Sequence, residues 1–491
     1  MNWAKLMRLT VSIILLGLAQ GDSWIITPGE NISIQGMIDL ARPGDIVHVE
    51  GGTYYENINV DKPLTLRGVE MPVVDGGGNG SSITLSADGI VLEGFVATNP
   101  SKSPEEAAGI KVSSDYNIIK NNSVYNNSIG IILNNSDNNS IEANNFSNNG
   151  FGIYLLGSHG NKIAGNNATK NGEGIRLRDS RNNTIAGNNA SFNADYGVVL
   201  KESTNNTLKR NQMSGNGNNF DAGGENDIDT SNRVDGKAIY YLVGAINMTI
   251  DSSLDAAGIV YCLNCVNITI KDQNFENNSL GVFFHNTTNS SIEKNVLKNE
   301  NGIIFHRSNN NTITGNNFSN GSDAIILLEA YRNTIADNIV IDNHKNGFLL
   351  QESRHNTITG NSINNDGSHN GIHLDRSSNN MIRDNNIRDG NDGISLLRAD
   401  WNTIMDNLVS NSKKNGILLD RSHNNTLIEN NASYNSNNGI KLDNSNDNNI
   451  TDNKAYYNQR YGICIEKSND NIITDNKAFY NGWYGICIEK S

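Results

Sequence analysis

Short strand-like steps recur along the chain, and each one alternates apolar with polar residues. One step reads Gly-Ile-x-Leu or a close variant, as at Gly130, Gly152 and Gly174. A second step reads Asn-x-Ile with another Asn three residues beyond the Ile, as at Asn161 and Asn183. Both return at intervals of about 22 residues. Because side chains two positions apart lie on the same face of a strand, the pattern predicts short strands with one apolar face.

A single coil of such strands cannot bury its apolar face, whereas stacked coils bury a continuous core. The frequent Asn-Gly turns exclude a helical repeat, which would need helix formers at a spacing of about 3.6 residues. We therefore predict an all-β fold: a single-stranded, right-handed parallel β-helix, or solenoid. About 16 coils with a rise of roughly 4.8 Å each would form a rod near 75 Å long.

The second Asn of each Asn-x-Ile step is predicted to stack on its equivalent in the next coil. Asn tolerates left-handed backbone angles, and its amide can bond the amide of the neighbouring Asn. The expected ladder contains Asn144, Asn166, Asn188, Asn316, Asn338, Asn361, Asn385, Asn407, Asn430, Asn453 and Asn476.

The N-terminal 21 residues have the pattern of a signal peptide. Lys5 and Arg8 precede a short apolar run over residues 9–18, and small residues favour cleavage after Gly21. The apolar run is too short for a bilayer span, so the mature chain is predicted to have no transmembrane segment. We expect a secreted or cell-surface protein outside the cytoplasm.

The rest of the chain divides by how well it keeps the period. A short helix near residues 34–41 is expected to cover the first coil. The last strand has no visible cap in the sequence, so its bare edge could support self-association. The axis is expected to continue through the irregular insertion. The predicted parts are an N-terminal cap with the first coils (22–100), β-helix repeats (101–210), an irregular insertion (211–257) and further repeats (258–491).

The charge and cysteine content limit the classes of partner and the compartment that the sequence is compatible with. The formal net charge is −14, which argues against nucleic acid because phosphate binding needs a basic face. The four cysteines fit an oxidising compartment. Cys464 and Cys487 occupy the same position in adjacent coils and are candidates for a disulfide, while Cys262 and Cys265 form a distant Cys-x-x-Cys pair suited to structural thiols or a local disulfide.

A column of acidic residues follows the Gly-Ile-x-Leu strands near the C-terminus. Neighbouring carboxylates in register would lie roughly 5 Å apart, so one pKa should rise or a cation should bind between them. The alternatives are a strip that binds Ca²⁺ or sugar, an acid/base pair, and a solvated ladder neutralised by adjacent basic residues. The strip comprises Asp420, Asp443, Glu466 and Glu489, with Lys441 on the same face as Asp443.

Three further features bear on binding. His373 and Asp375 share a strand face, and the acidic segment 221–229 is a weak calcium candidate that lacks EF-hand spacing. Several outward positions inside the Gly-Ile-x-Leu strands are apolar, which indicates either a contact surface or burial under long turns. These positions are Val199, Phe283, Ile304, Ile326, Leu349 and Leu418.

The segment PGDIVHVEGGTYYENINVDKPLTLRG (43–68), followed by the repeated coils, resembles the NosD-like β-helix family. That family belongs to the wider pectate-lyase-like group of carbohydrate-binding and sugar-hydrolysis (PbH1) repeats. The break DIDTSNRVDGKAIYYL (227–242) is similar to an element of multi-repeat archaeal surface proteins. The resemblance implies the fold. It carries over no copper chemistry, because the sequence has no Met/His cluster suited to copper.

These observations favour a structural scaffold, or a protein that binds carbohydrate, envelope glycans or other surface proteins. A polysaccharide lyase, epimerase or hydrolase is the first alternative, and a maturation factor like NosD is the second. The motifs of polygalacturonases and the Asp-Pro-His motif of alginate epimerases are absent from the sequence, so no catalytic residue is assigned and catalysis is not favoured. The sequence predicts no cofactor, with Ca²⁺ as the one alternative.

Overall fold

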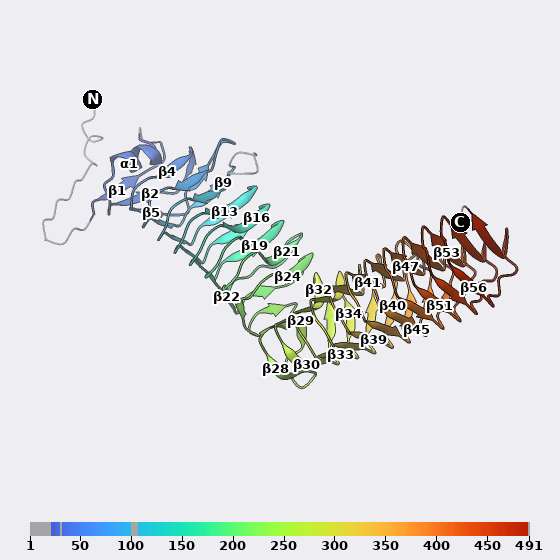
Figure 1. The fold of residues 1–491 in the computed structure, drawn as a ribbon. Coiled ribbons are helices and arrows are strands. Elements are labelled where there is room, and N and C mark those ends of the chain that lie inside the picture. The colour runs from blue at the N-terminus through green and yellow to red at the C-terminus, as the bar shows by residue number, and fades with distance from the viewer. Residues whose placement is uncertain (1–20, 30–31, 100–106, 490–491) are drawn as a thin grey trace, which may run out of the picture.

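A computed structural model describes residues 21–29, 32–99 and 107–489. The predicted signal peptide falls almost entirely on residues 1–20, outside the described part of the chain. The fold is a right-handed parallel β-solenoid, as predicted, with almost no helix. Figure 1 shows two stacks of coils, which we call the N-terminal arm and the C-terminal arm.

Each arm has three sheets, built mainly of parallel strands, that run along its axis. In the N-terminal arm, the first sheet has ten strands and runs from β1 (Ser23–Ile26) to β25 (Asp227–Ile228). The second sheet has eight strands and lies between β4 (Ile58–Val60) and β24 (Asn218–Ala222). The third sheet lies between β3 (Thr53–Tyr55) and β18 (Asn167–Thr169). In the C-terminal arm, the first sheet has fourteen strands and runs from β23 (Gln212–Met213) to β57 (Ile486–Glu489). The second sheet has eleven strands and runs from β28 (Ile246–Ile250) to β56 (Ile472–Thr474). The third sheet has eight strands and runs from β31 (Asn274–Glu276) to β52 (Asn431–Ser433).

The solenoid has about 21 turns, so the predicted 16 coils were too few. One sheet contributes ten strands in the N-terminal arm and its counterpart contributes eleven in the C-terminal arm, one from each coil. The sequence estimate was low because the first coils and the region around 211–257 depart from the Asn-x-Ile spacing. Those segments nevertheless complete coils.

The helix α1 (Ile34–Leu40) lies at the N-terminal end of the first stack (Figure 1). Ser33 caps the helix by accepting a hydrogen bond from the backbone N–H of Gly36 at 3.0 Å. Ile34, Met37 and Ile38 are buried and join the core of the N-terminal arm. The helix thus places an apolar face next to β4 and β1, where the first coil would otherwise meet solvent.

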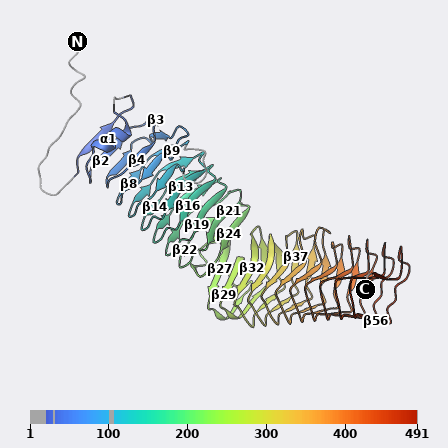
Figure 2. The ribbon, with the colours of Figure 1, turned by 45° about the horizontal axis from the view of Figure 1, so that its top comes forward.

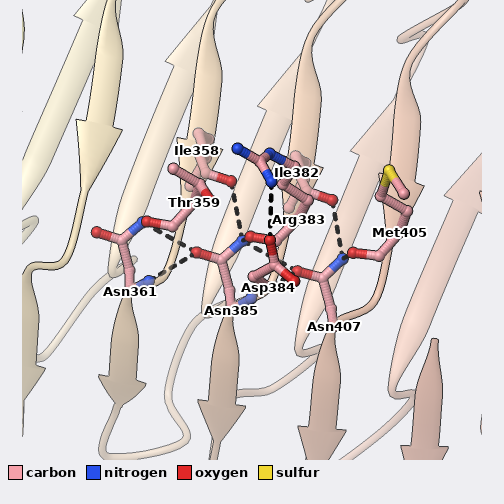
Figure 3. Close-up of polar contacts among 9 residues, drawn as sticks. All are labelled: Ile358, Thr359, Asn361, Ile382, Arg383, Asp384, Asn385, Met405 and Asn407. Atoms are coloured by element: carbon pink, nitrogen blue, oxygen red, sulfur yellow. Dashed lines mark hydrogen bonds and ion pairs between the residues drawn. The ribbon is translucent and has the colours of Figure 1, made fainter. Parts of the chain in front are cut away.

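The predicted asparagine ladder is confirmed by hydrogen bonds between successive coils (Figure 3). The side-chain amide of Asn361 donates to Oδ1 of Asn385 at 2.9 Å, and that of Asn385 donates to Oδ1 of Asn407 at 2.9 Å. The ladder residues do not adopt the left-handed angles that asparagine tolerates. The preceding residue has the positive φ, as in Gly360 (68°) and Asp384 (56°), and this turn directs the asparagine side chain inward.

The irregular region forms a bend, and the prediction that one axis continues through it is wrong. β26 (Arg233–Val234) pairs antiparallel with β27 (Lys237–Val243) through a two-residue turn at Asp235 and Gly236, both with positive φ. This hairpin feeds the third sheet of the N-terminal arm into the fourteen-stranded sheet of the C-terminal arm. Figures 1 and 2 show the two arms meeting at an angle there.

The strands at the bend are buried on both faces. In β29 (Ala257–Leu263) all seven residues are buried. Ile259, Tyr261 and Leu263 join the core of the N-terminal arm, whereas Val260 and Cys262 join the core of the C-terminal arm. Because successive side chains point to opposite faces, one strand belongs to both cores and covers the end of the first stack.

Candidate functional site

A cavity of about 630 Å³ lies where the two arms meet, and we call it the elbow pocket. Sequence reasoning did not identify it, because its walls come from segments far apart in the chain. Its polar and aromatic lining includes Lys201, Glu202, Asp221 and Glu225 from the N-terminal arm, and Tyr261, Asn264, Phe283, His285 and His306 from the C-terminal arm.

The wall from the N-terminal arm is built by the end of β24 and the turn after it. Asp221 is on the strand, and Gly223 and Gly224 then turn the chain toward Glu225. Gly224 has φ +75°, and a Cβ there would lie 2.6 Å from Thr204 Cγ2, so this position requires glycine. The Tyr241 hydroxyl also donates a hydrogen bond to the carbonyl of Gly224. The turn is therefore held by contacts from both arms.

The wall from the C-terminal arm is the outer face of its first coils. β32 (Leu280–His285) and β35 (Asn301–His306) pair in register, so that Phe283 stands beside Ile304 and His285 beside His306. Phe283 and Ile304 are partly buried and pack against the core of the N-terminal arm. These two residues belong to the apolar outward positions noted in the sequence, which were the available signal for this wall.

Tyr261 forms the floor and joins the two walls. Its hydroxyl donates to Oδ1 of Asp221 at 3.2 Å and accepts from the backbone N–H of Ala222 at 3.3 Å. Its ring contacts Phe220 edge-on at 6.0 Å and Phe283 at 5.6 Å between centroids. Burial raises the pKa of Tyr261 well above its ordinary value, so the phenol stays protonated and orients the Asp221 carboxylate.

Two imidazoles face each other on the second wall. The Nδ1 atoms of His285 and His306 are 3.1 Å apart, and Nε2 of His306 lies 3.9 Å from Oε1 of Glu329. Burial, and then the positive charges possible at His306 and Arg307, lower the pKa of His285 below its ordinary value. Two imidazolium rings cannot coexist at this distance without strong repulsion, so at most one of the pair is charged.

Carboxylates outnumber cations among the lining residues. Lys201 Nζ is 3.8 Å from Oδ2 of Asp221, and Asn264 donates its amide to Oε1 of Glu225 at 2.8 Å across the bend. Glu202 and Glu225 are both exposed to solvent at the pocket. The lining thus combines a partly apolar wall with oriented carboxylates and an amide, the general composition of a small-molecule site.

The acidic strip lies in register along β50 (Ile417–Asp420), β53 (Ile440–Asp443), β55 (Ile463–Glu466) and β57. Basic neighbours contact its acids: Arg421 Nε lies 3.0 Å from Asp420 Oδ1, and Lys441 Nζ lies 3.2 Å from Glu466 Oε2. Each contact neutralises one carboxylate locally, which makes the strip a weaker candidate than the elbow pocket.

The other proposed site residues lie away from the elbow pocket lining. His373 and Asp375 stand on β44 (Ile372–Asp375), and Asp375 pairs with Arg376 at 3.2 Å. Burial lowers the pKa of His373, and its Nδ1 has no hydrogen-bond partner. Both residues lie on the C-terminal arm, and neither lines the pocket.

The four cysteines are free thiols in the structure. Cys464 and Cys487 are partners in the strand register, as their spacing predicted, but the disulfide stays a prediction. Cys262 is on β29 and Cys265 follows the end of this strand, and the two residues between them line the elbow pocket. A hydrogen bond from Cys262 lowers the pKa of Cys265 to about 7.

A family model described as "Periplasmic copper-binding protein (NosD)" matches residues 49–245, 225–368 and 363–484. The chain belongs to the NosD family. The search of curated proteins found no sequence match. Within the described residues, this NosD-family chain has no helix that is long and apolar enough to cross a bilayer.

Several solved structures resemble this NosD-family protein at low identity. A double mutant of the periplasmic alginate epimerase AlgG is 12% identical, with a TM-score of 0.35, over 92% of this chain and 83% of that one. PfbA, a surface adhesin of Streptococcus pneumoniae, is 13% identical, with a TM-score of 0.33, over 69% and 87%. Pectate lyase Pel9A is 15% identical, with a TM-score of 0.30, over 60% and 77%. Such low scores allow no conclusion about function.

The donor atoms of this NosD-family chain do not make a complete copper centre. Among the described residues, no group of three or more His, Cys, Asp or Glu is placed to hold a metal ion. The best fragment is the His285–His306 pair, whose 3.1 Å spacing suits two imidazoles bound to one ion at about 2.0 Å each. Copper in a protein usually has further ligands, which this fragment lacks.

Proposed function

We propose that the protein is an exported β-helix protein that binds a saccharide in the elbow pocket. The observation that carries this proposal is the convergence, in one cavity, of a partly exposed apolar wall and an amide from one arm with carboxylates from the other arm. Sugar rings offer apolar C–H faces for aromatic side chains such as Phe283, and hydroxyls for groups such as Glu225 and Asn264.

The location outside the cytoplasm has separate support. The N-terminal residues have the charge and apolar pattern of a signal peptide, and the description of the family includes the word periplasmic. Glycans of the cell envelope are accessible in that compartment. The fold itself hosts many roles, so the proposal depends on the pocket and not on the solenoid.

Binding of oligosaccharides to the full chain, measured by calorimetry, tests the proposal. Phe283→Ala is expected to weaken binding of any saccharide that binds the wild type by about tenfold, because it removes the aromatic wall. Leu349→Ala is the matched control, since Leu349 occupies the same outward column three coils further along the arm. Equal effects of the two substitutions, or no binding across a broad glycan panel, would contradict the proposal.

A copper ion is the second candidate ligand. It is favoured by the spacing of the His285 and His306 nitrogens and by the description of the family. In this case, His285→Asn and His306→Asn should each abolish binding of copper in a direct titration followed by absorption. His373→Asn provides a histidine control remote from the pair. Retention of tight copper binding by both pocket variants would exclude the pair as the site.

A further inference from the structure

We propose that the elbow pocket selects a saccharide with a positive charge, an amino sugar, over neutral sugars and uronates. This inference rests on the proposed function and adds the chemical class of the ligand. It starts from the charges that line the cavity: three carboxylates, from Glu202, Asp221 and Glu225, against the single ammonium of Lys201. An acidic pocket attracts a cation and repels an anion.

The Lys201 charge is already engaged within the pocket. Its Nζ lies 3.8 Å from the Asp221 carboxylate, whose other oxygen accepts the hydrogen bond of Tyr261. These contacts fix Asp221 in the structure and offset its charge. Glu202 and Glu225 are left as the negative groups at the opening, and only one oxygen of Glu225 is held by Asn264. The net charge available to a ligand is therefore negative.

The lining of the opposite wall contains no lysine or arginine. Arg307, which follows His306 in the chain, is already paired, since its Nε lies 2.9 Å from Oε2 of Glu329. The two imidazoles, 3.1 Å apart, disfavour simultaneous protonation. Phe283 presents an aromatic ring, and the face of such a ring attracts an ammonium group. A uronate carboxylate would meet Glu202 and Glu225, and no lysine or arginine of the lining is free to pair with it.

Calorimetry with three matched ligands tests the selection: a glucosamine tetramer, its N-acetylated form and a galacturonate tetramer. Measurements at low ionic strength and about pH 6.5 keep the amine largely protonated, because amines of this kind titrate near the range of an α-amino group. The glucosamine tetramer should bind about tenfold more tightly than the N-acetylated form. The uronate should bind more weakly than either, and added salt should reduce the differences.

The decisive variant is the double substitution Glu202→Gln/Glu225→Gln, which keeps side-chain size and removes two charges. It should reduce the preference for the amine over the N-acetylated tetramer to about twofold or less, whatever its effect on the affinity for the N-acetylated form. Asp470→Asn/Asp475→Asn removes two exposed charges in the last coil and should change neither. Equal or tighter binding of the neutral or uronate ligand by the wild type would overturn the inference and leave saccharide binding intact. Failure of all three ligands to bind would overturn both.

Discussion

At the scale of single residues, buried asparagine amides hold one coil to the next. The side-chain amide of Asn385 donates to the carbonyl of Ile358 at 3.0 Å and to the carbonyl of Arg383, in its own coil, at 2.9 Å. It also donates to Oδ1 of Asn407 in the next coil. Its Oδ1 accepts from the backbone and side chain of Asn361. The amide thereby satisfies polar groups that would otherwise be buried without partners.

Asn385→Ala is expected to destabilise the C-terminal arm by about 1–3 kcal/mol, because it leaves buried donors and acceptors unpaired. The backbone N–H of Asn361, which donates to Oδ1 of Asn385 at 3.0 Å, should exchange its hydrogen faster. Thermal unfolding and hydrogen exchange measure the two effects. Asn364→Ala is the control, since Asn364 lies one coil away and is exposed. A variant as stable as this control would show that the ladder contributes little.

The His285 side chain should make stability depend on pH. Its pKa in the folded protein lies below the ordinary 6.5, so the unfolded chain takes up a proton first as the pH falls. Stability that is present above pH 6.5 is therefore lost as the pH decreases from 6.5 through the folded pKa. The charged or titratable groups around the ring are His306, Arg307 and Glu225.

The measurement is the melting temperature between about pH 7.5 and 5 for the wild type and for His285→Asn. The wild type should lose more stability on acidification than the variant. Identical pH profiles would contradict the assignment, and His373→Asn shows how much another histidine with a lowered pKa contributes.

The sequence could predict the asparagine ladder because its spacing repeats with the coils. It could not predict which residue of each turn is left-handed, since Asn, Asp and Gly all favour that conformation. In the structure, Gly360, Asp384 and Asp406 take the positive φ, and the asparagine after each one is buried. Which of the two adjacent residues takes the positive φ depends on packing inside the coil, and the local sequence does not specify that packing.

At the scale of elements, β27 and β29 determine the architecture because both of their faces are buried. Their sequences, KAIYYLV and AGIVYCL, are nearly continuous apolar runs, which is typical of parallel strands covered on two sides. The Asp-Gly turn before β27 is likewise a strong hairpin signal. Both signals were in the sequence. They do not by themselves predict a bend, because the surrounding period gives no reason to expect a second core.

Tyr261→Ala is expected to cost about 3–5 kcal/mol in stability, since the ring is fully buried between the two arms. The last coil of the N-terminal arm should lose its cover, so amides in β24 should exchange faster than those in mid-arm strands. Tyr434→Ala is the control, because that side chain is 58% exposed. Thermal unfolding and hydrogen exchange give the comparison. Equal effects of both substitutions would contradict the role of Tyr261 at the bend.

At the scale of the whole molecule, the bend creates a site that a straight solenoid would lack. Along either arm, the outward side chains form flat columns, and the acidic strip is one of them. At the elbow, the turn after β24 and the outer face of β32 and β35 meet at an angle and enclose a cavity. Repeat spacing predicted the columns, and only the hairpin that redirects the sheet brings Glu225 near His285.

An experimental structure of the full chain with bound glucosamine tetramer tests the central claim most directly. The prediction is two β-helix arms joined at an angle, with the saccharide in the cavity between Phe283 and Glu225. A straight solenoid with one axis through residues 211–257, or a saccharide bound along Asp420 to Glu489 with the elbow pocket empty, would contradict it.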